Sequence, residues 1–263
     1  MTHLTRLWGT ARVGRWLVVL ALALLLARPL PVRAARTAGP ARGAASGPVG
    51  RLNAVQRVGL YAIGWRTWKF FDADVDPATH LPMDNIGLDG APARGTYTSP
   101  TNIGVYLWSI VAARDLHYIS PVAAEARVSA TLDTIERLTK WHGFLLSWYD
   151  TRNGNRVAGP DDLTSKEGTP LKGEFISTVD NGWYATGLVV TRQAFPALAP
   201  RATALLDAMD FGIFYDRGDP STDITAGQMY GGYNADVGPA TFHYGNLNTE
   251  TRIAAYIGIV LQR

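Results

Sequence analysis

The segment Thr101–Ala113, with the sequence TNIGVYLWSIVAA, contains no charged residue, and two later segments share this property: Asn181–Thr191 (NGWYATGLVVT) and Ile253–Leu261 (IAAYIGIVL). Each is nine to thirteen residues long. That is too short for a membrane span, which needs about 20 residues. A helix that is apolar on every side is buried on every side. We therefore expect three short helices that are enclosed by other parts of the protein.

Amphipathic helices are predicted before each of these segments. The patterns run from Asn53 to about Phe71, onward from Pro121, and from Pro200 to Phe214, and each combines one apolar face with one polar face. The apolar face of the first consists of Val55, Val58, Ala62 and Trp65. This alternation predicts an all-α fold of the (α/α) toroid type, in which outer helices keep one face in solvent and inner helices are covered. A plain helical bundle is the alternative, but it does not explain the strict alternation.

Three connections between the expected helices are long and rich in glycine and aromatic residues: Met83–Ser99, Trp148–Thr178 and Asp216–Asn248. Helix–helix connections usually take about two to eight residues, and longer ones are often functional. We expect one short β-hairpin in this part of the chain, formed by Phe144–Tyr149 and Phe175–Val179. The remaining residues of the long connections are expected to be loops with a functional role.

The chain of 263 residues is short for a toroid of six helical hairpins. The charge-free segments begin about 70 to 80 residues apart, which leaves room for about three hairpins. The last charge-free pattern also runs to the end of the sequence without a capping glycine or proline. These observations predict a truncated chain with an open barrel edge, at which Val105, Trp108, Val189 and Ile257 are exposed. Because an exposed apolar edge is typical of an interface, we expect self-association through it.

The first 34 residues have the pattern of a secretory signal peptide. Arg6, Arg12 and Arg15 form a positive region, Leu17–Ala27 is apolar, and Val32–Ala34 supplies small residues before a cleavage position. An uncleaved membrane anchor is the alternative, and it would be the only contact with a membrane. Residues 35–50 are predicted to be a disordered leader, and residues 51–263 the partial barrel domain. The protein is therefore expected to be secreted or periplasmic.

Charge and composition exclude several classes of function. The formal charge is +3 and the isoelectric point is near 9.2, but cleavage after Ala34 removes five arginines and leaves a nearly neutral chain, so a nucleic acid is not an expected partner. The absence of cysteine excludes a disulfide framework, a thiol nucleophile and a cysteine-ligated metal centre. No two of the five histidines are close in sequence, which excludes a local histidine metal motif. No metal or cofactor is expected.

Each charge-free segment begins in or just after a polar stretch: Thr98–Asn102, Ser177–Trp183 and His243–Arg252. In a toroid the N-terminal ends of the inner helices open onto one face, so these residues are expected around one cavity. Carboxylates there can supply acid–base catalysis, amides can bond to hydroxyl groups, and aromatic rings can stack on the C–H faces of a sugar. The expected catalytic carboxylates are Asp180, Glu250 and Asp150. The expected substrate-binding residues are Asn102, Trp148, Tyr149, Asn181, Trp183, Tyr230, Tyr233, His243, Tyr244, Asn248 and Arg252, and the partner is an oligo- or polysaccharide.

The alternative for several of these residues is a structural role. Good helix N-caps are supplied by Ser99, Thr101, Asp180 and Thr249. Glu250 in a first helical turn interacts favourably with the helix dipole. His243, which is followed by Tyr244, is expected to be a hydrogen-bonded pocket residue rather than a base.

Four motifs occur in the order known from one family: Thr98–Tyr106, Trp148–Arg152, Ser177–Trp183 and Asn248–Ala254. Together with the pattern Phe70–Asp84, they resemble the bacterial glucoamylase-like family, which includes β-1,2-glucanases and the cyclising region of cyclic β-1,2-glucan synthases. The resemblance covers nearly the whole chain after about Arg57 and implies an (α/α)6 barrel and β-glucan chemistry. The family's glycine after the Pro-Ala-Thr turn is His80 here, and the family's barrel continues beyond the position of Arg263.

These observations predict a secreted glycoside hydrolase or transglycosylase that acts on a bacterial β-glucan, with β-1,2-glucan as one candidate. Asp180 and Glu250 are expected to face one cavity from the N-terminal ends of neighbouring buried helices, about 6.5–9.5 Å apart if the reaction inverts the anomeric centre. Acid and base are not assigned, because burial and neighbouring groups set the pKa values. The alternative is a non-catalytic glycan-binding helical domain or an inactive fragment.

Overall fold

Several of the described helices begin where the sequence supplies a polar side-chain cap. The computed structural model describes residues 52–87, 94–219, 221–244 and 250–261, so the predicted signal peptide and leader lie outside the described residues. Asn53 caps the first helix, as the sequence predicts, and it also forms a capping box with Gln56. Ser99 and Ser120 cap the next two helices, and each is followed by a proline at the first helical position.

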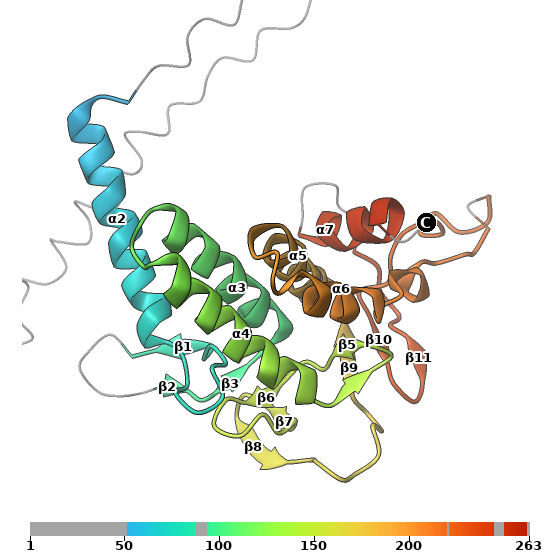
Figure 1. Ribbon diagram of the computed structural model, residues 1–263. Coiled ribbons are helices and arrows are strands. Elements are labelled where there is room, and N and C mark those ends of the chain that lie inside the picture. Colours follow the sequence, from blue (N-terminus) through green and yellow to red (C-terminus); the bar gives the residue numbers. More distant parts are fainter. Residues whose placement is uncertain (1–51, 88–93, 220, 245–249, 262–263) are drawn as a thin grey trace, which may run out of the picture. The chain divides into compact units, whose positions relative to one another are not determined.

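The described part of the chain alternates outer and inner helices, as predicted. The helices are α2 (Ala54–Ala73), α3 (Pro100–Asp115), α4 (Pro121–Arg137), α5 (Thr178–Ala194), α6 (Ala199–Asp207), the 3-10 helix η1 (Phe211–Phe214), α7 (Thr251–Tyr256) and its π-helical continuation η2 (Ile257–Leu261). Helix α5 packs between α3 and α7, and these three helices form the inner layer. The outer helices pack against this layer: α2 and α4 against α3, and α6 against α5 (Figure 1). The predicted partial (α/α) toroid is thereby confirmed.

Glycines allow the inner helices to approach each other closely. A Cβ atom on Gly104 of α3 would lie 2.3 Å from the carbonyl oxygen of Trp183 in α5, and one on Gly187 would lie 2.6 Å from the carbonyl oxygen of Gly104. A Cβ atom on Gly182 would lie 3.0 Å from the backbone nitrogen of Ala254 in α7. Any larger residue would force these backbones apart, so the spacing of the inner layer depends on glycine.

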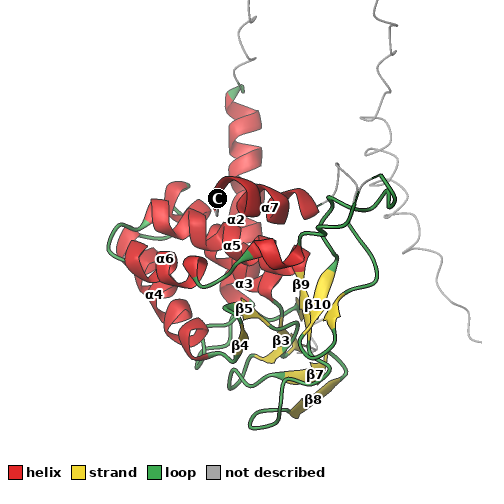
Figure 2. Ribbon diagram, turned by 90° about the vertical axis from the view of Figure 1, so that its right-hand side faces the viewer, coloured by secondary structure: helices red, strands yellow, loops and turns green. Residues whose placement is uncertain are grey.

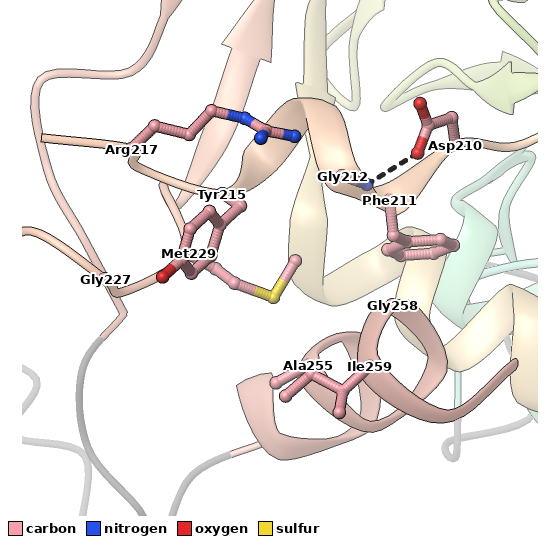
Figure 3. A pocket seen from close by; sticks show the side chains of 10 residues that line it. All are labelled: Asp210, Phe211, Gly212, Tyr215, Arg217, Gly227, Met229, Ala255, Gly258 and Ile259. Atoms are coloured by element: carbon pink, nitrogen blue, oxygen red, sulfur yellow. Dashed lines mark hydrogen bonds between the residues drawn. The ribbon is translucent and has the colours of Figure 1, made fainter. Parts of the chain in front are cut away.

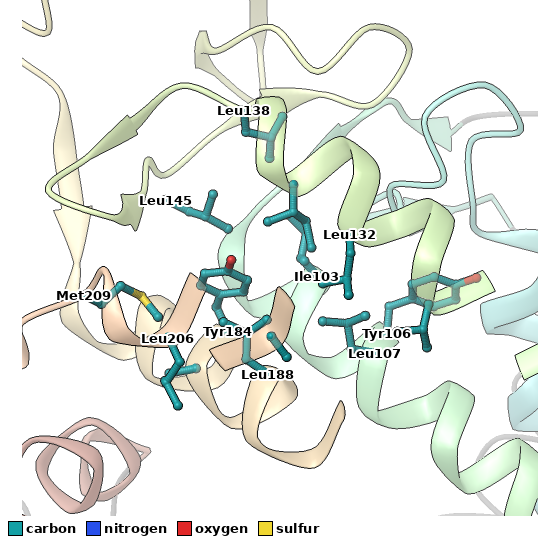
Figure 4. Packing of buried hydrophobic residues seen from close by; sticks show 14 of the residues in the cluster. Ile103, Tyr106, Leu107, Leu132, Leu138, Leu145, Tyr184, Leu188, Leu206 and Met209 are labelled. Carbon is teal, nitrogen blue, oxygen red and sulfur yellow. The ribbon is translucent and has the colours of Figure 1, made fainter. Parts of the chain in front are cut away.

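The hydrophobic core lies between the inner and outer helices. Figure 4 shows Ile103 and Leu107 of α3 directed toward Leu132 of α4, and Tyr184 and Leu188 of α5 beside them. These five side chains are fully buried. Leu206 of α6 and Met209 extend the same cluster below α5. The core therefore joins the outer helices α4 and α6 to the inner helices α3 and α5.

Short antiparallel strands gather at one end of the helices (Figure 2). They pair as β1 (Asn85–Ile86) with β2 (Arg94–Gly95), β3 (Tyr97–Thr98) with β6 (Tyr149–Asp150), β4 (Lys140–Trp141) with β5 (Phe144–Leu145), β7 (Val157–Gly159) with β8 (Asp162–Ser165), and as a three-stranded sheet in which β10 (Gly232–Asn234) lies between β9 (Phe175–Ser177) and β11 (Gly238–Pro239). Strands β3 and β9 lead directly into α3 and α5. The strands therefore lie at the N-terminal ends of two inner helices.

The predicted hairpin between Phe144–Tyr149 and Phe175–Val179 is wrong. Phe144 pairs with Trp141 across a two-residue turn, in which His142 and Gly143 have φ values of 47° and 82°. This is the backbone conformation of a tight hairpin turn, and a loop of two residues closes at a much lower entropic cost than one of about 25 residues. Phe175 pairs instead with Asn234.

Two predictions about helix boundaries and faces are also wrong. The helix expected over Pro200–Phe214 ends at Asp207, because the Asp210 carboxylate caps the 3-10 helix η1 instead. The apolar face expected for α2 is exposed: Val55 and Val58 are 83 % and 70 % accessible to solvent. Figures 1 and 2 show the reason, since the N-terminal half of α2 extends beyond the helices against which its C-terminal half packs.

The residues predicted to be exposed at an open edge differ from one another. Trp108 is exposed, Val105 and Val189 are half-buried, and Ile257 is 2 % accessible, so the prediction is wrong for Ile257. Ile257, the first residue of η2, belongs to the hydrophobic core cluster. None of the described helices is both long and apolar enough to cross a membrane.

Candidate active site

The N-terminal turns of α3 and α5 are linked by a side-chain hydrogen bond. The Thr101 hydroxyl donates to Asp180 Oδ1 over 2.5 Å. Neither residue is a cap, because Ser99 accepts from the backbone of Asn102 and Ser177 accepts from the backbone of Asp180. The cap role expected as an alternative for Thr101 and Asp180 is therefore filled by the serines, and the half-buried Asp180 carboxylate points across the helix interface.

Glu250 lies at the start of the third inner helix, α7. Its side chain is exposed and makes no capping hydrogen bond. The indole Nε1–H of Trp183 donates to Glu250 Oε2 over 3.3 Å. Since Trp183 follows Asp180 by three residues on α5, the two carboxylates lie next to the same helical face. The structure thus places Asp180 and Glu250 at the starts of neighbouring inner helices, with Trp183, one turn after Asp180, bonded to Glu250.

A third carboxylate, Asp84, lies beside the start of α3 and was missed by the sequence analysis. Its Oδ1 accepts from Asn102 Nδ2 over 3.0 Å, and its Oδ2 accepts from the Tyr97 hydroxyl over 2.9 Å. Partial desolvation, followed by the bond to Asp84, raises the pKa of Tyr97. The Tyr97 ring in turn packs edge-on against Trp148, with 5.5 Å between centroids. Asp84 is the last residue of the motif Phe70–Asp84, and this position is the signal that could have identified it. A single aspartate in a loop, however, gives no chemical reason to predict a role in the site.

Asp150 lies in β6 and is surrounded by donors. The Arg152 guanidinium contacts both of its oxygens, with Nη2 at 2.6 Å, and the Arg152 backbone N–H donates over 2.9 Å. Burial acts to raise the pKa of Asp150, but the hydrogen bonds and charge of Arg152 outweigh it and lower the pKa below its usual value. Asp150 is therefore held as an anion by a positive partner, in contrast to Asp180 and Glu250, whose donors are neutral.

Two of the expected substrate-binding residues are fully buried. The Tyr149 hydroxyl donates to the Thr139 carbonyl over 2.6 Å and accepts from the Leu146 backbone, and burial raises its pKa. The Asn181 side chain bonds to both backbone groups of Leu145 and so connects β5 to the first turn of α5. The polar side-chain atoms of Tyr149 and Asn181 bond to backbone groups inside the protein, and these two residues are not exposed at the candidate site.

Tyr230 and His243 belong to a second polar cluster with Asp216. His243 Nε2 lies 2.8 Å from Asp216 Oδ2, and the Tyr230 ring packs on His243 with 4.6 Å between centroids. The backbone N–H of Gly218, followed by His243 and Tyr230, lowers the pKa of Asp216. Because the Thr178 hydroxyl bonds to the Tyr230 carbonyl, this cluster adjoins the start of α5.

The remaining expected residues are spread around this end of the molecule. Tyr233 stacks on Trp141 with 4.8 Å between centroids, and it shares a face of its sheet with the buried Ile176. Tyr244 is exposed beside Phe242. Arg252 is exposed and lines a groove of about 380 Å³ between α5 and α7, together with Tyr256. Asn248, and Thr249 among the expected caps, lie outside the described residues.

A cavity of about 330 Å³ lies between η1 and α7 (Figure 3). Phe211, Met229 and Ile259 supply apolar walls, and Arg217 supplies a cation. The carboxylate of Asp210, at its rim, accepts from the Gly212 backbone over 2.8 Å. None of the expected catalytic or substrate-binding residues that the structure describes lines this cavity, so the carboxylates at the starts of the inner helices form a separate candidate site.

Comparisons of the sequence with known proteins identify related chains. Residues 63–218 match the model of a family described as a protein of unknown function, DUF3131. The chain is also 35 % identical over 128 residues to the cyclic β-(1,2)-glucan synthase NdvB of Rhizobium meliloti (strain 1021), which corresponds to 48 % of this chain and 4 % of the synthase.

Two solved structures share the fold. An endo-β-1,2-glucanase from Chitinophaga pinensis, in complex with sophorotriose and glucose, superposes with a TM-score of 0.57 at 17 % identity and covers 77 % of this chain. A glucoamylase-like protein from Bacteroides caccae gives the same three values. The chain spans about half of each of these structures, 47 % and 48 % respectively.

These matches confirm the resemblance to the glucoamylase-like proteins and β-1,2-glucanases. The family model begins within α2, ends after η1 and includes Asp84, Asp150 and Asp180. By the match of more than half its residues, the chain belongs to the DUF3131 family, and its fold is a partial (α/α)6 barrel of the glucoamylase-like type.

Proposed function

We propose that this chain acts on a β-glucan as a glycoside hydrolase or transglycosylase, with β-1,2-linked glucose chains as the substrate class. The observation that carries the proposal is the pair Asp180 and Glu250, which lie at the starts of neighbouring inner helices, each oriented by a side-chain donor, Thr101 or Trp183. The likeness to a cyclic β-(1,2)-glucan synthase and to a glucanase in complex with sophorotriose supports the choice of linkage.

Two carboxyl groups can cleave a glycosidic bond. One protonates the leaving oxygen, while the other activates a water molecule or attacks the sugar. Thr101 orients Asp180 and Trp183 orients Glu250, and both donors are neutral groups. Asp150, paired with Arg152, is held as an anion and is suited to a structural role.

Asp84 adds a third carboxylate to the same face. Asn102, to which Asp84 is bonded, directly follows the Thr101 that bonds to Asp180. Trp148 and Tyr97 lie behind Asp84 as an aromatic pair. We assign this group to sugar binding, because carboxylate and amide groups together can accept from and donate to the hydroxyls of one sugar ring.

Export is part of the proposal. The positive residues, the apolar segment Leu17–Ala27 and the small residues before position 35 support a secreted or periplasmic protein. Fractionation of cells that produce the full chain, with N-terminal sequencing of the exported form, tests this point. A start at Ala35 is expected, and retention of residues 1–34 in a membrane fraction would contradict it.

The catalytic proposal is tested by release of reducing ends from β-1,2-glucan. We expect Asp180→Asn and Glu250→Gln each to lower turnover by about a hundredfold or more, which is the usual contribution of a general acid or base. Asp115→Asn is the matched control, because Asp115 lies at the opposite end of α3 and is exposed. Binding of the glucan without turnover, unchanged by Asp180→Asn, would indicate a glycan-binding domain instead.

A further inference from the structure

We propose that the stacked indoles of Trp108 and Trp183 form a platform for one pyranose ring of the saccharide, adjacent to Glu250. This inference rests on the proposed function, and it names a binding element of that site, Trp108, which the sequence analysis did not select for binding.

The two indoles are held parallel across the α3–α5 interface. Their ring centroids are 5.9 Å apart and their planes differ by 23°. Trp183 is half-buried, whereas 43 % of the surface of Trp108 is accessible. The stack thus covers one face of Trp108 and leaves a large part of its indole open to a ligand.

The platform is connected to the carboxylates through the helices that carry it. Trp108 follows Thr101 by seven residues, or about two helical turns, so both lie on the same face of α3. Side chains in a helix lean toward its N-terminus, so the Trp108 indole covers part of the helical turn that separates it from the turn of Thr101. Trp183 donates its Nε1–H to Glu250, and the stack therefore lies next to this carboxylate.

The close approach of α3 and α5 makes the stack possible. Gly104, one turn before Trp108, contacts the backbone of Trp183 itself, and Gly187 contacts the backbone of Gly104. These contacts fix the two tryptophans at stacking distance before any ligand binds. A preformed aromatic surface needs little reordering on binding, which favours affinity.

The chemistry of the surroundings fits a sugar ring. A pyranose presents C–H groups on its faces and hydroxyl groups at its edge, so it can stack on an indole while its hydroxyls reach polar groups. Glu250 supplies such a group beside the platform, and Asp180 supplies a second one in the first turn of the helix that carries Trp183; each carboxylate is already bonded to one protein donor. An aromatic or aliphatic ligand without hydroxyls would leave these carboxylates without new partners.

The test is saccharide binding by the full chain, measured by calorimetry with sophorotriose, laminaritriose, cellotriose and maltotriose. For whichever of these the wild type binds, we expect Trp108→Ala and Trp108→Leu to weaken affinity about tenfold, because both remove the flat ring. Trp108→Phe keeps a ring and is expected to retain affinity within about threefold. Trp65→Ala is the matched control, since Trp65 is also 43 % accessible but lies on α2 beside Tyr118.

The outcomes separate the two proposals. Wild-type affinity in Trp108→Ala and Trp108→Leu would overturn the platform and leave the proposed function standing. A wild type that binds none of the four saccharides would overturn the proposed function and the platform with it. Equal losses in Trp65→Ala and Trp108→Ala would show a general effect on the fold, and would overturn the platform as a specific element.

Discussion

Two regions of the described chain hold carboxylates with different kinds of partner. At the starts of the inner helices, Asp180 and Glu250 are each oriented by a neutral donor, Thr101 or Trp183. In the strands and loops of residues 149–174, Asp150 is paired with Arg152, and the buried Glu174 contacts both Arg156 and Lys166. The same residue types thus serve two purposes. The carboxylates with charged partners connect loops, and we propose the carboxylates with neutral partners as the catalytic pair.

The largest expected effect is the loss of the buried arginine in the second region. Arg156 is fully buried, and its guanidinium contacts Glu174 and the carbonyl oxygens of Lys166, Thr169 and Pro170. Arg156→Ala would leave Glu174 buried with one fewer positive partner, so we expect a loss of about 3–5 kcal/mol in the free energy of unfolding. Urea denaturation measures it.

A surface arginine with similar partners provides the control. Arg201 contacts Glu136 and Asp133, and its side chain is more accessible than that of Arg156. We expect Arg201→Ala to cost about 1 kcal/mol, since exposed ion pairs contribute little. Equal losses for the two variants would show that the stability of the segment 156–174 does not depend on the burial of the Arg156 charge.

The next effect concerns the glycine contact that brings Asp180 and Thr101 together. Gly104→Ala places a methyl group against the Trp183 backbone, where no side chain can move aside, and we expect a loss of about 1–3 kcal/mol. Near-ultraviolet circular dichroism should also change, because α3 and α5 must separate and the Trp108–Trp183 stack must loosen.

The matched substitution is Gly59→Ala in α2. A Cβ atom there would have no neighbour within 4 Å, and alanine is the better helix former, so a gain of about 0.5–1 kcal/mol is expected. If both glycine variants gained stability, the close approach of the inner helices would not exist in solution.

A smaller effect is the pH dependence of the stabilisation that Asp150 contributes. The pKa of Asp150 is lower in the folded than in the unfolded chain, so its stabilisation is present above about pH 4 and is lost as the pH falls through the folded value. We expect Asp150→Asn to cost about 1.5 kcal/mol at pH 7 and less at pH 3. The measurement is urea denaturation at both pH values.

Asp180→Asn is the comparison for that experiment. Its main partner is the neutral hydroxyl of Thr101, so the expected loss at pH 7 is below about 1 kcal/mol. A loss for Asp180→Asn that exceeds the loss for Asp150→Asn would assign Asp180 to the structural group and remove the contrast between the two regions.

The order of the helices could be predicted from the sequence because it depends on local patterns. The charge-free segments and the polar residues Asn53 and Ser99 can be read directly from the sequence. In the structure Asn53 and Ser99 cap their helices, and the inner and outer helices alternate as predicted. The hairpin prediction failed because strand pairing depends on which segments meet, and the turn at His142 and Gly143 was not considered. Asp84 was missed for the same reason, since only the fold places it beside Asn102.

The smallest expected effect is on α2, where the sequence pattern and the structure disagree most. Val58 belongs to the apolar face that the pattern predicts, but it is largely exposed, whereas Val128 of α4 is fully buried in the core. We expect Val58→Ala to change the free energy of unfolding by less than about 0.5 kcal/mol, and Val128→Ala to lower it by about 1–2 kcal/mol, since a buried side chain leaves a cavity. Urea denaturation of both variants at several protein concentrations is the measurement. A loss for Val58→Ala as large as that for Val128→Ala would mean that this face of α2 is covered in solution, and a loss that grows with protein concentration would identify the cover as a second copy of the chain.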